Sequence, residues 1–108
     1  MQAPPEFINK YLTTYTAGWG VLREQRKQQA VAKGIFPPDK DIVDSLSQFD
    51  SWAEVGEEEK KMLVKSMAVF AGMLDAMDYH IGRFMSYLKK EGLYDNTIFI
   101  VTADNGPE

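Results

Sequence analysis

The 108-residue sequence has the length of one domain, and its 44% apolar content is that of an ordinary globular protein. The net charge of −4 argues against a nucleic-acid partner, because phosphate binding needs a basic surface. The absence of cysteine excludes disulfides, zinc–thiolate sites and thiol nucleophiles from this sequence. No apolar run approaches the ~20 residues that span a bilayer, and the N-terminus lacks signal-peptide features. We therefore expect a soluble chain without a membrane partner.

The first predicted element is a helix over residues 5–16. Pro4 and Pro5 stand where a helix begins, and the apolar residues that follow share one helical face. Gly18 and Gly20 are expected to end this helix, because glycine disfavours a helix interior.

A second helix is predicted over residues 21–33, with Gly34 as its stop. Residues 39–50 fit either a short helix or an ordered loop. The first half of the chain therefore contains helices but no recognisable chemical motif.

The strongest local pattern predicts one long helix over residues 57–91. Ser51 and Glu54 have the spacing of a capping box, and acidic residues fill the first turn. Apolar residues then recur in alternating steps of four and three, at Leu63, Met67, Phe70, Leu74, Met77, Ile81, Phe84 and Leu88. Such a stripe is typical of a helix that packs against a sheet or against other helices. It also fits the heptad pattern of a coiled coil, in which two helices pack along one seam. Gly82 favours the first reading, since a mid-helix glycine often marks the close approach of another element.

The last predicted element is a β-strand over residues 97–102. Its unbroken run of β-branched and aromatic residues is typical of a strand buried on both faces of a parallel sheet. No second segment of comparable strand character accompanies it. The sequence therefore predicts a mostly helical internal segment of a larger α/β protein.

Asp104 and Asn105 follow this predicted strand directly. In α/β proteins ligands bind beyond the carboxyl ends of strands, and carboxylate and amide oxygens are the hard ligands that calcium and magnesium prefer. The same residue types are common in plain turns, so the motif alone leaves both readings open.

Several motifs together resemble the sulfatase family. The stretch 77–83 carries Asp-x-x-Ile-Gly-Arg, residues 92–97 read Gly-Leu-Tyr-Asp-Asn-Thr, and residues 103–106 read Ala-Asp-Asn-Gly. The segments 3–11 and 18–26 are similar to helical segments of arylsulfatase-type members. The resemblance covers nearly the whole chain and about a fifth of a complete sulfatase.

This resemblance implies a parent enzyme of the alkaline-phosphatase-like α/β fold that hydrolyses sulfate esters. It implies a formylglycine nucleophile, made from a Cys/Ser-x-Pro-x-Arg motif that this sequence lacks, and one Ca²⁺ ion, with Mg²⁺ as an alternative. Of the family's site residues, only the metal ligands map onto this chain, at Asp104 and Asn105. We therefore expect no catalytic or other cofactor-binding residue in the chain, and no activity from it alone. The compartment stays open between the periplasm and the cytoplasm of a bacterium.

Two alternatives stand beside this interpretation. Related phosphonate and phosphate monoester hydrolases share the Asp-Asn ending, so the chain could be a segment of such an enzyme. It could instead be a helical interaction module that self-associates through its apolar stripe and strand.

His80 and the carboxylates of Asp75 and Asp78 are residue types that serve as acid–base groups. No partner for such chemistry accompanies them in the sequence, so we interpret His80 as a structural or surface residue and Asp78 as structural.

Overall fold

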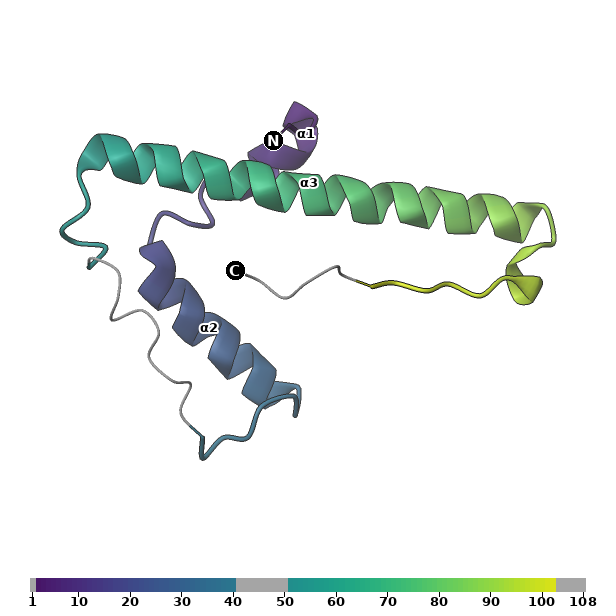
Figure 1. Cartoon of the computed structure of the whole chain (residues 1–108), viewed down its shortest axis with the longest axis horizontal. Coiled ribbons are helices and arrows are strands. Elements are labelled where there is room, and N and C mark those ends of the chain that lie inside the picture. Colours follow the sequence, from purple (N-terminus) through teal and green to yellow (C-terminus); the bar gives the residue numbers. More distant parts are fainter. Residues whose placement is uncertain (1, 41–50, 103–108) are drawn as a thin grey trace. The chain divides into compact units, whose positions relative to one another are not determined.

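The computed structural model describes residues 2–40 and 51–102. Within these ranges the chain forms three α-helices and two short 3₁₀ helices (Figure 1), in the order α1 (Pro5–Ile8), η1 (Asn9–Tyr11), α2 (Gly18–Ala32), α3 (Glu57–Lys90) and η3 (Tyr94–Asn96). The chain divides into two compact units, residues 1–76 and 77–108, and α3 continues from the first into the second. None of the helices in the described ranges combines the length and apolar character needed to cross a bilayer.

The first helix is much shorter than residues 5–16. α1 ends at Ile8, η1 continues only to Tyr11, and turns follow. The residues after Tyr11 include several threonines, which are weak helix formers because their branched side chains crowd the preceding turn. The Thr16 hydroxyl donates a hydrogen bond to the carbonyl of Thr13 at 2.9 Å. This local bond favours a turn over continued helix.

α2 begins at Gly18, where the sequence analysis expects a break. Gly18 has φ +83°, a left-handed conformation that glycine adopts without a Cβ clash. The Trp52 ring also occupies the space in which a Cβ would lie, with ring atoms 2.3–2.6 Å from that position. The neighbouring Trp19 ring meets Trp52 edge-on, with centroids 4.9 Å apart. The two tryptophans thus join the start of α2 to the segment before α3.

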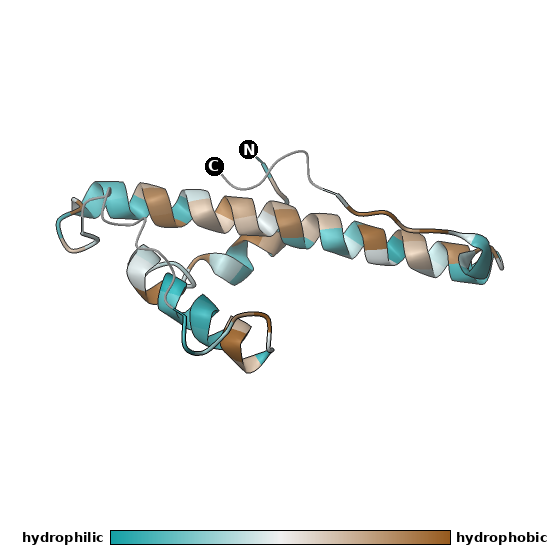
Figure 2. Ribbon diagram, turned by 60° about the horizontal axis from the view of Figure 1, so that its bottom comes forward, coloured by the Kyte–Doolittle hydropathy of each residue, from teal (hydrophilic) through white to brown (hydrophobic). Residues whose placement is uncertain are grey.

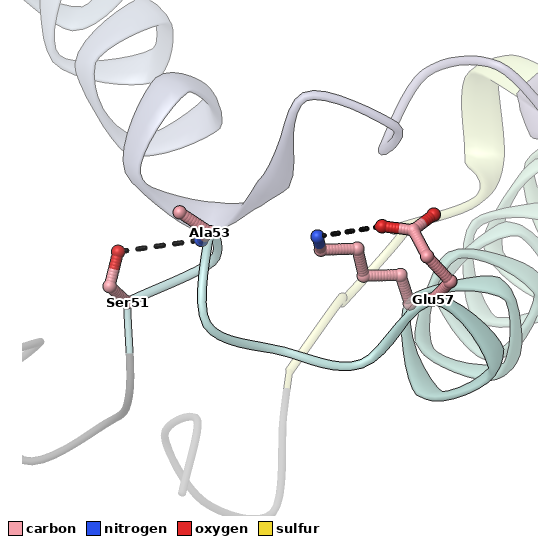
Figure 3. Close-up of polar contacts among 4 residues, drawn as sticks. Ser51, Ala53 and Glu57 are labelled. Carbon is pink, nitrogen blue, oxygen red and sulfur yellow. Dashed lines mark hydrogen bonds and ion pairs between the residues drawn. The ribbon is translucent and has the colours of Figure 1, made fainter.

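The capping-box residues form a turn before α3 and do not cap the helix itself. The backbone N–H of Ser51 donates to the Glu54 carboxylate at 3.1 Å. The N–H of Ala53 donates to the Ser51 hydroxyl at 3.4 Å, as Figure 3 shows. α3 starts three residues beyond this turn, at Glu57. Its first turn is acidic, as the positive end of a helix dipole favours.

The apolar core of the first unit lies where α1 crosses α3. Phe7 and Ala68 are buried, and Gly72 is the point of closest approach. A Cβ on Gly72 would lie 3.0 Å from the backbone nitrogen and Cα of Ile8. Gly72 therefore performs the role that the sequence analysis expects of Gly82, where a Cβ would meet nothing within 4 Å in the described residues.

An ion pair reinforces this contact. The Lys10 ammonium donates to the Asp75 carboxylate at 2.7 Å, and this hydrogen bond raises the pKa of Lys10 above its ordinary 10.5. Burial, followed by the nearby negative charge of Asp75, raises the pKa of Tyr11 as well. Asp75, considered in the sequence as an acid–base group, is thus a structural partner of a lysine.

Asp75→Asn is expected to move the Lys10 pKa back toward 10.5, because the neutral amide neither accepts as strongly nor supplies a negative charge. Since the Lys10 pKa is raised in the folded chain, the pair contributes stability below pH 10.5, and this contribution is lost as pH rises through the raised value. NMR titration of the lysine side chains measures the shift. Glu59→Gln is the matched control, since Glu59 is not among the groups that shift Lys10. An unchanged Lys10 pKa in Asp75→Asn would contradict the pairing.

In the second unit, α3 ends at Lys90 and the chain reverses at Gly92. Gly92 has φ +69°, and the N–H of Leu93 donates to the carbonyl of Leu88 at 2.9 Å. This 6→1 bond is the mark of a glycine-terminated helix. Residues 97–102 then run back beside the C-terminal part of α3 (Figures 1 and 2).

The predicted β-strand over residues 97–102 is wrong. The segment is extended, with φ −122° and ψ +130° at Thr97, but the described residues contain no strand. Nor is it buried, because Ile98, Ile100 and Val101 are 84–88% exposed. A strand is defined by hydrogen bonds to a neighbouring strand, and β-branched composition alone supplies none. The structure is accordingly helical and displays no α/β sheet among the described residues.

Candidate functional site

The motif residues of α3 gather on one solvent-exposed face. Asp78, Gly82 and Arg83, which carry the Asp-x-x-Ile-Gly-Arg pattern, line a shallow open depression together with Tyr79 and Ser86. The spacing of three and four residues places these side chains on neighbouring turns of the helix. The Ser86 hydroxyl donates to the carbonyl of Gly82 at 2.9 Å, so it is satisfied within the helix. The depression is a surface feature of a single helix.

Arg83 is the centre of the side-chain contacts on this face. Its guanidinium lies 5.9 Å from the centroid of the Tyr79 ring and 3.4 Å from Nδ1 of His80. The Tyr79 and His80 rings also meet edge-on, at 5.3 Å. His80 therefore lies beside a permanent cation on an exposed part of α3. The interpretation of His80 as a structural or surface residue stays a prediction.

The turn after α3 leads toward the predicted metal ligands. The Thr97 hydroxyl donates to the carbonyl of Leu93 at 2.7 Å, and the Thr97 N–H donates to the carbonyl of Tyr94 at 3.1 Å. The Tyr94 ring lies 5.6 Å from the Phe99 ring and 4.6 Å from the Lys89 ammonium. These contacts tie the start of the extended segment to the end of α3. The direction in which the chain leaves the helix is thus set locally.

Asp104 and Asn105 lie outside the described residues, so the structure does not place them. In the ranges 2–40 and 51–102, no three histidine or carboxylate side chains form a group suited to a metal ion. The structure therefore tests neither the predicted ligands nor the predicted calcium ion. Of the motif residues, it positions those of α3 and of the Gly92–Thr97 turn.

Comparison with known proteins identifies the family. The sequence model of the sulfatase family matches residues 1–108, the whole length of the chain. An uncharacterized sulfatase of Schizosaccharomyces pombe is 40% identical over 110 residues, and an arylsulfatase of Klebsiella aerogenes is 33% identical over 106 residues. An arylsulfatase of Clostridium perfringens is 38% identical over 47 residues, which cover 44% of this chain. The chain belongs to the sulfatase family, and the predicted resemblance is confirmed.

The chain spans about a fifth of the length of these relatives. Its matched region amounts to 20% of the Schizosaccharomyces pombe protein and 23% of the Klebsiella aerogenes protein. The regions matched to these two relatives cover 100% and 98% of this chain, respectively. The similarity therefore extends through both compact units and includes the residues that the structure leaves undescribed.

Sequence reasoning missed two structural features of the first unit. The first is the close contact at Gly72, although a glycine in the middle of a strongly apolar helix signals such a contact as much as Gly82 does. The pairing of Lys10 with Asp75 joins residues 65 positions apart, and no local pattern could have predicted it.

Proposed function

We propose that this chain supplies two calcium ligands, Asp104 and Asn105, to the active site of an arylsulfatase-type sulfuric ester hydrolase. The observation that carries the proposal is the family match over residues 1–108, which includes the Asp-Asn-Gly motif. The arylsulfatase names of two relatives support the substrate class, an ester of sulfuric acid.

The donor set fits the ion. A carboxylate from Asp104 and an amide oxygen from Asn105 are hard ligands of the type that Ca²⁺ binds, and Mg²⁺ accepts the same atoms. A bound divalent cation would polarise the sulfate ester and orient the nucleophile. Within this proposal, Asp104 would also offset one positive charge of the ion, whereas Asn105 would contribute only a neutral dipole.

The described residues have a supporting role in this proposal. α3 and the Gly92 turn hold the start of the segment that continues to Asp104, through the Thr97 hydrogen bonds and the Tyr94–Phe99 contact. Precise placement of a ligand depends on such packed neighbours. The Asp78–Arg83 motif lies on the same helix, and we assign it to the support of the fold.

The 108-residue chain alone is expected to hydrolyse no sulfate ester. It contains no Cys/Ser-x-Pro-x-Arg motif from which a formylglycine nucleophile could be made. Without a nucleophile, a metal ion has no attacking group to orient. Incubation of the purified chain with 4-nitrophenyl sulfate and Ca²⁺, followed by absorbance of released nitrophenolate, measures the rate.

A chain carrying Asp104→Ala and Asn105→Ala together is the control for copurifying sulfatases, because it differs only at the proposed ligands. Turnover that exceeds this control and coelutes with the chain would contradict the expected inactivity.

A further inference from the structure

Tyr94 lies at the centre of the side-chain contacts that follow α3. The Lys89 ammonium, from the last turn of the helix, lies 4.6 Å from the centroid of the Tyr94 ring. The Phe99 ring, in the extended segment, has its centroid 5.6 Å from that of Tyr94, and the two rings are tilted by 41°. All three residues belong to the second unit. The Tyr94 ring therefore links the end of the helix to the segment that follows it.

The backbone of the turn fixes the point at which the chain leaves it. The Tyr94 carbonyl accepts a hydrogen bond from the Thr97 N–H at 3.1 Å, and the Leu93 carbonyl accepts one from the Thr97 hydroxyl at 2.7 Å. These bonds hold Thr97 in place, but a single fixed position leaves the direction of the next residues open. A second contact sets that direction, and Phe99 makes it with the Tyr94 ring, two residues further along.

The exposure of the extended segment agrees with such a contact. Phe99 is 39% exposed, whereas Ile98 and Ile100 are 88% and 84% exposed. Successive side chains of an extended chain point to opposite sides, so these two isoleucines lie on the side away from the Phe99 ring. Val101 shares the side of Phe99 but is 87% exposed. Among these four residues, the packing is therefore concentrated at Phe99.

Both contacts of the Tyr94 side chain depend on its aromatic ring. A lysine ammonium over the face of a ring is attracted by the negative potential of the π electrons. Two rings at this separation also attract each other beyond the apolar area that they bury. A phenylalanine ring offers both interactions, whereas a leucine side chain offers neither. The arrangement therefore requires an aromatic ring at position 94.

The proposed metal ligands follow Phe99 closely in the sequence. Asp104 is five residues beyond Phe99, and five residues span at most about 18 Å. A change in the direction of the chain at Phe99 would therefore be passed on to Asp104 over a short length of chain. Residues that orient metal ligands typically change the metal affinity by about 10–100-fold when they are substituted.

We propose that Tyr94 is a positioning residue for the metal ligands: its ring, in contact with Lys89 and Phe99, directs the segment that leads to Asp104 and Asn105. The proposal rests on the proposed function, because it takes these two residues to bind the metal. It goes beyond that function by assigning the placement of the ligands to one aromatic ring outside the ligand set.

Tyr94→Leu and Tyr94→Phe, made in a full-length sulfatase that contains this chain, test the role of the ring. After removal of the metal, isothermal titration with Ca²⁺ measures the dissociation constant of each variant. We expect Tyr94→Leu to weaken calcium binding roughly 10-fold and Tyr94→Phe to match the parent enzyme. Tyr79→Leu is the matched control, because Tyr79 also contacts a cation, Arg83, but both of these residues lie on α3. Equal calcium affinity in Tyr94→Leu and the parent, or an equal loss in Tyr79→Leu, would overturn the proposal.

Asp104→Ala separates this proposal from the one on which it rests. Loss of calcium in Asp104→Ala, together with parent-like affinity in Tyr94→Leu, would support the ligand assignment and refute the positioning role. Calcium retained by Asp104→Ala would refute the ligand assignment, and the positioning role with it.

The packing of the ring is measured directly by NMR of the 108-residue chain. Nuclear Overhauser effects are expected between the rings of residues 94 and 99 in the parent and in Tyr94→Phe. In Tyr94→Leu, the ring protons of Phe99 are expected to shift toward the resonance positions of an unpacked phenylalanine. Absence of the ring-to-ring effect in the parent chain would overturn the proposal, whatever the calcium affinities of the longer enzymes.

Discussion

Gly18→Ala is expected to lower the thermal midpoint of the chain by roughly 10 °C or more. Two costs combine at this position. An alanine at φ +83° suffers a left-handed strain of about 1–2 kcal/mol. Its Cβ would also lie 2.3 Å from Cγ of Trp52, so the indole has to leave its place against α2. The edge-on contact of Trp52 with Trp19, of a kind worth about 0.5–1.5 kcal/mol, would be lost with it.

Gly20→Ala is the control for this effect. Gly20 also lies in α2, but a Cβ there would meet nothing within 4 Å among the described residues, and its φ is not positive. Alanine at a regular helix position is expected to be neutral or stabilising by about 0.5–1 kcal/mol. Near-ultraviolet circular dichroism adds a direct readout, since Trp19 and Trp52 are the chain's two tryptophans. If Gly18→Ala kept the melting curve and the tryptophan signal of Gly20→Ala, the packing of Trp52 against Gly18 would be refuted.

The contrast between these glycines shows what the sequence can and cannot predict. A helix stop such as Gly34 follows from local rules, because the left-handed residue and the 2.9 Å bond from the Ile35 N–H to the Ala30 carbonyl depend on neighbours in sequence. Gly18 begins a helix because of a tryptophan 34 positions away. Gly72 is required by Ile8, on a separate helix. Such requirements come from tertiary contacts, which spacing and composition do not encode.

In contrast, α3 could be predicted from the sequence, because the signals that define it are local. Its alternating apolar steps, acidic first turn and terminal lysines are all local, and the structure has a helix over Glu57–Lys90 where the sequence predicts one over 57–91. The segment after it shows the limit of the same reasoning. Ile98, Ile100 and Val101 have strand-forming side chains, but a strand also needs a partner backbone. Without one among the described residues, the segment is extended and exposed.

The candidate site also has features that the sequence predicts and features that it does not. The family was predictable because three motifs occur in a fixed order, and a match over residues 1–108 confirms it. The contacts of Arg83 with His80 and Tyr79 follow from their three- and four-residue spacing on a predicted helix. The pairing of Asp75 with Lys10, 65 positions away, does not follow from any spacing. The proposed ligands Asp104 and Asn105 follow from the motif alone, and substitution is their direct test.

Asp104→Ala, made in a full-length sulfatase that contains this chain, is expected to abolish both calcium binding and ester hydrolysis. The substitution removes a full negative charge that would face a divalent ion. The loss of activity is expected to exceed the ~10–100-fold that follows from losing a residue that only supports a metal ligand. Asn105→Ala removes a neutral dipole and is expected to cost less metal affinity and less activity. Metal content by atomic emission and initial rates with 4-nitrophenyl sulfate measure the two effects separately.

The 108-residue chain itself is expected to bind calcium weakly or not at all. Calcium takes six to eight oxygen ligands, and Asp104 with Asn105 supplies two side chains. Isothermal titration of the chain with Ca²⁺ therefore complements the substitutions in the longer enzyme. Asp104→Asn is the informative third variant, because it keeps an oxygen donor and removes only the charge. We expect its calcium affinity to fall between those of the parent and Asp104→Ala. Full metal content and turnover in Asp104→Ala would show that this aspartate is a turn residue, and the assignment of the metal site to the Asp-Asn pair would be wrong.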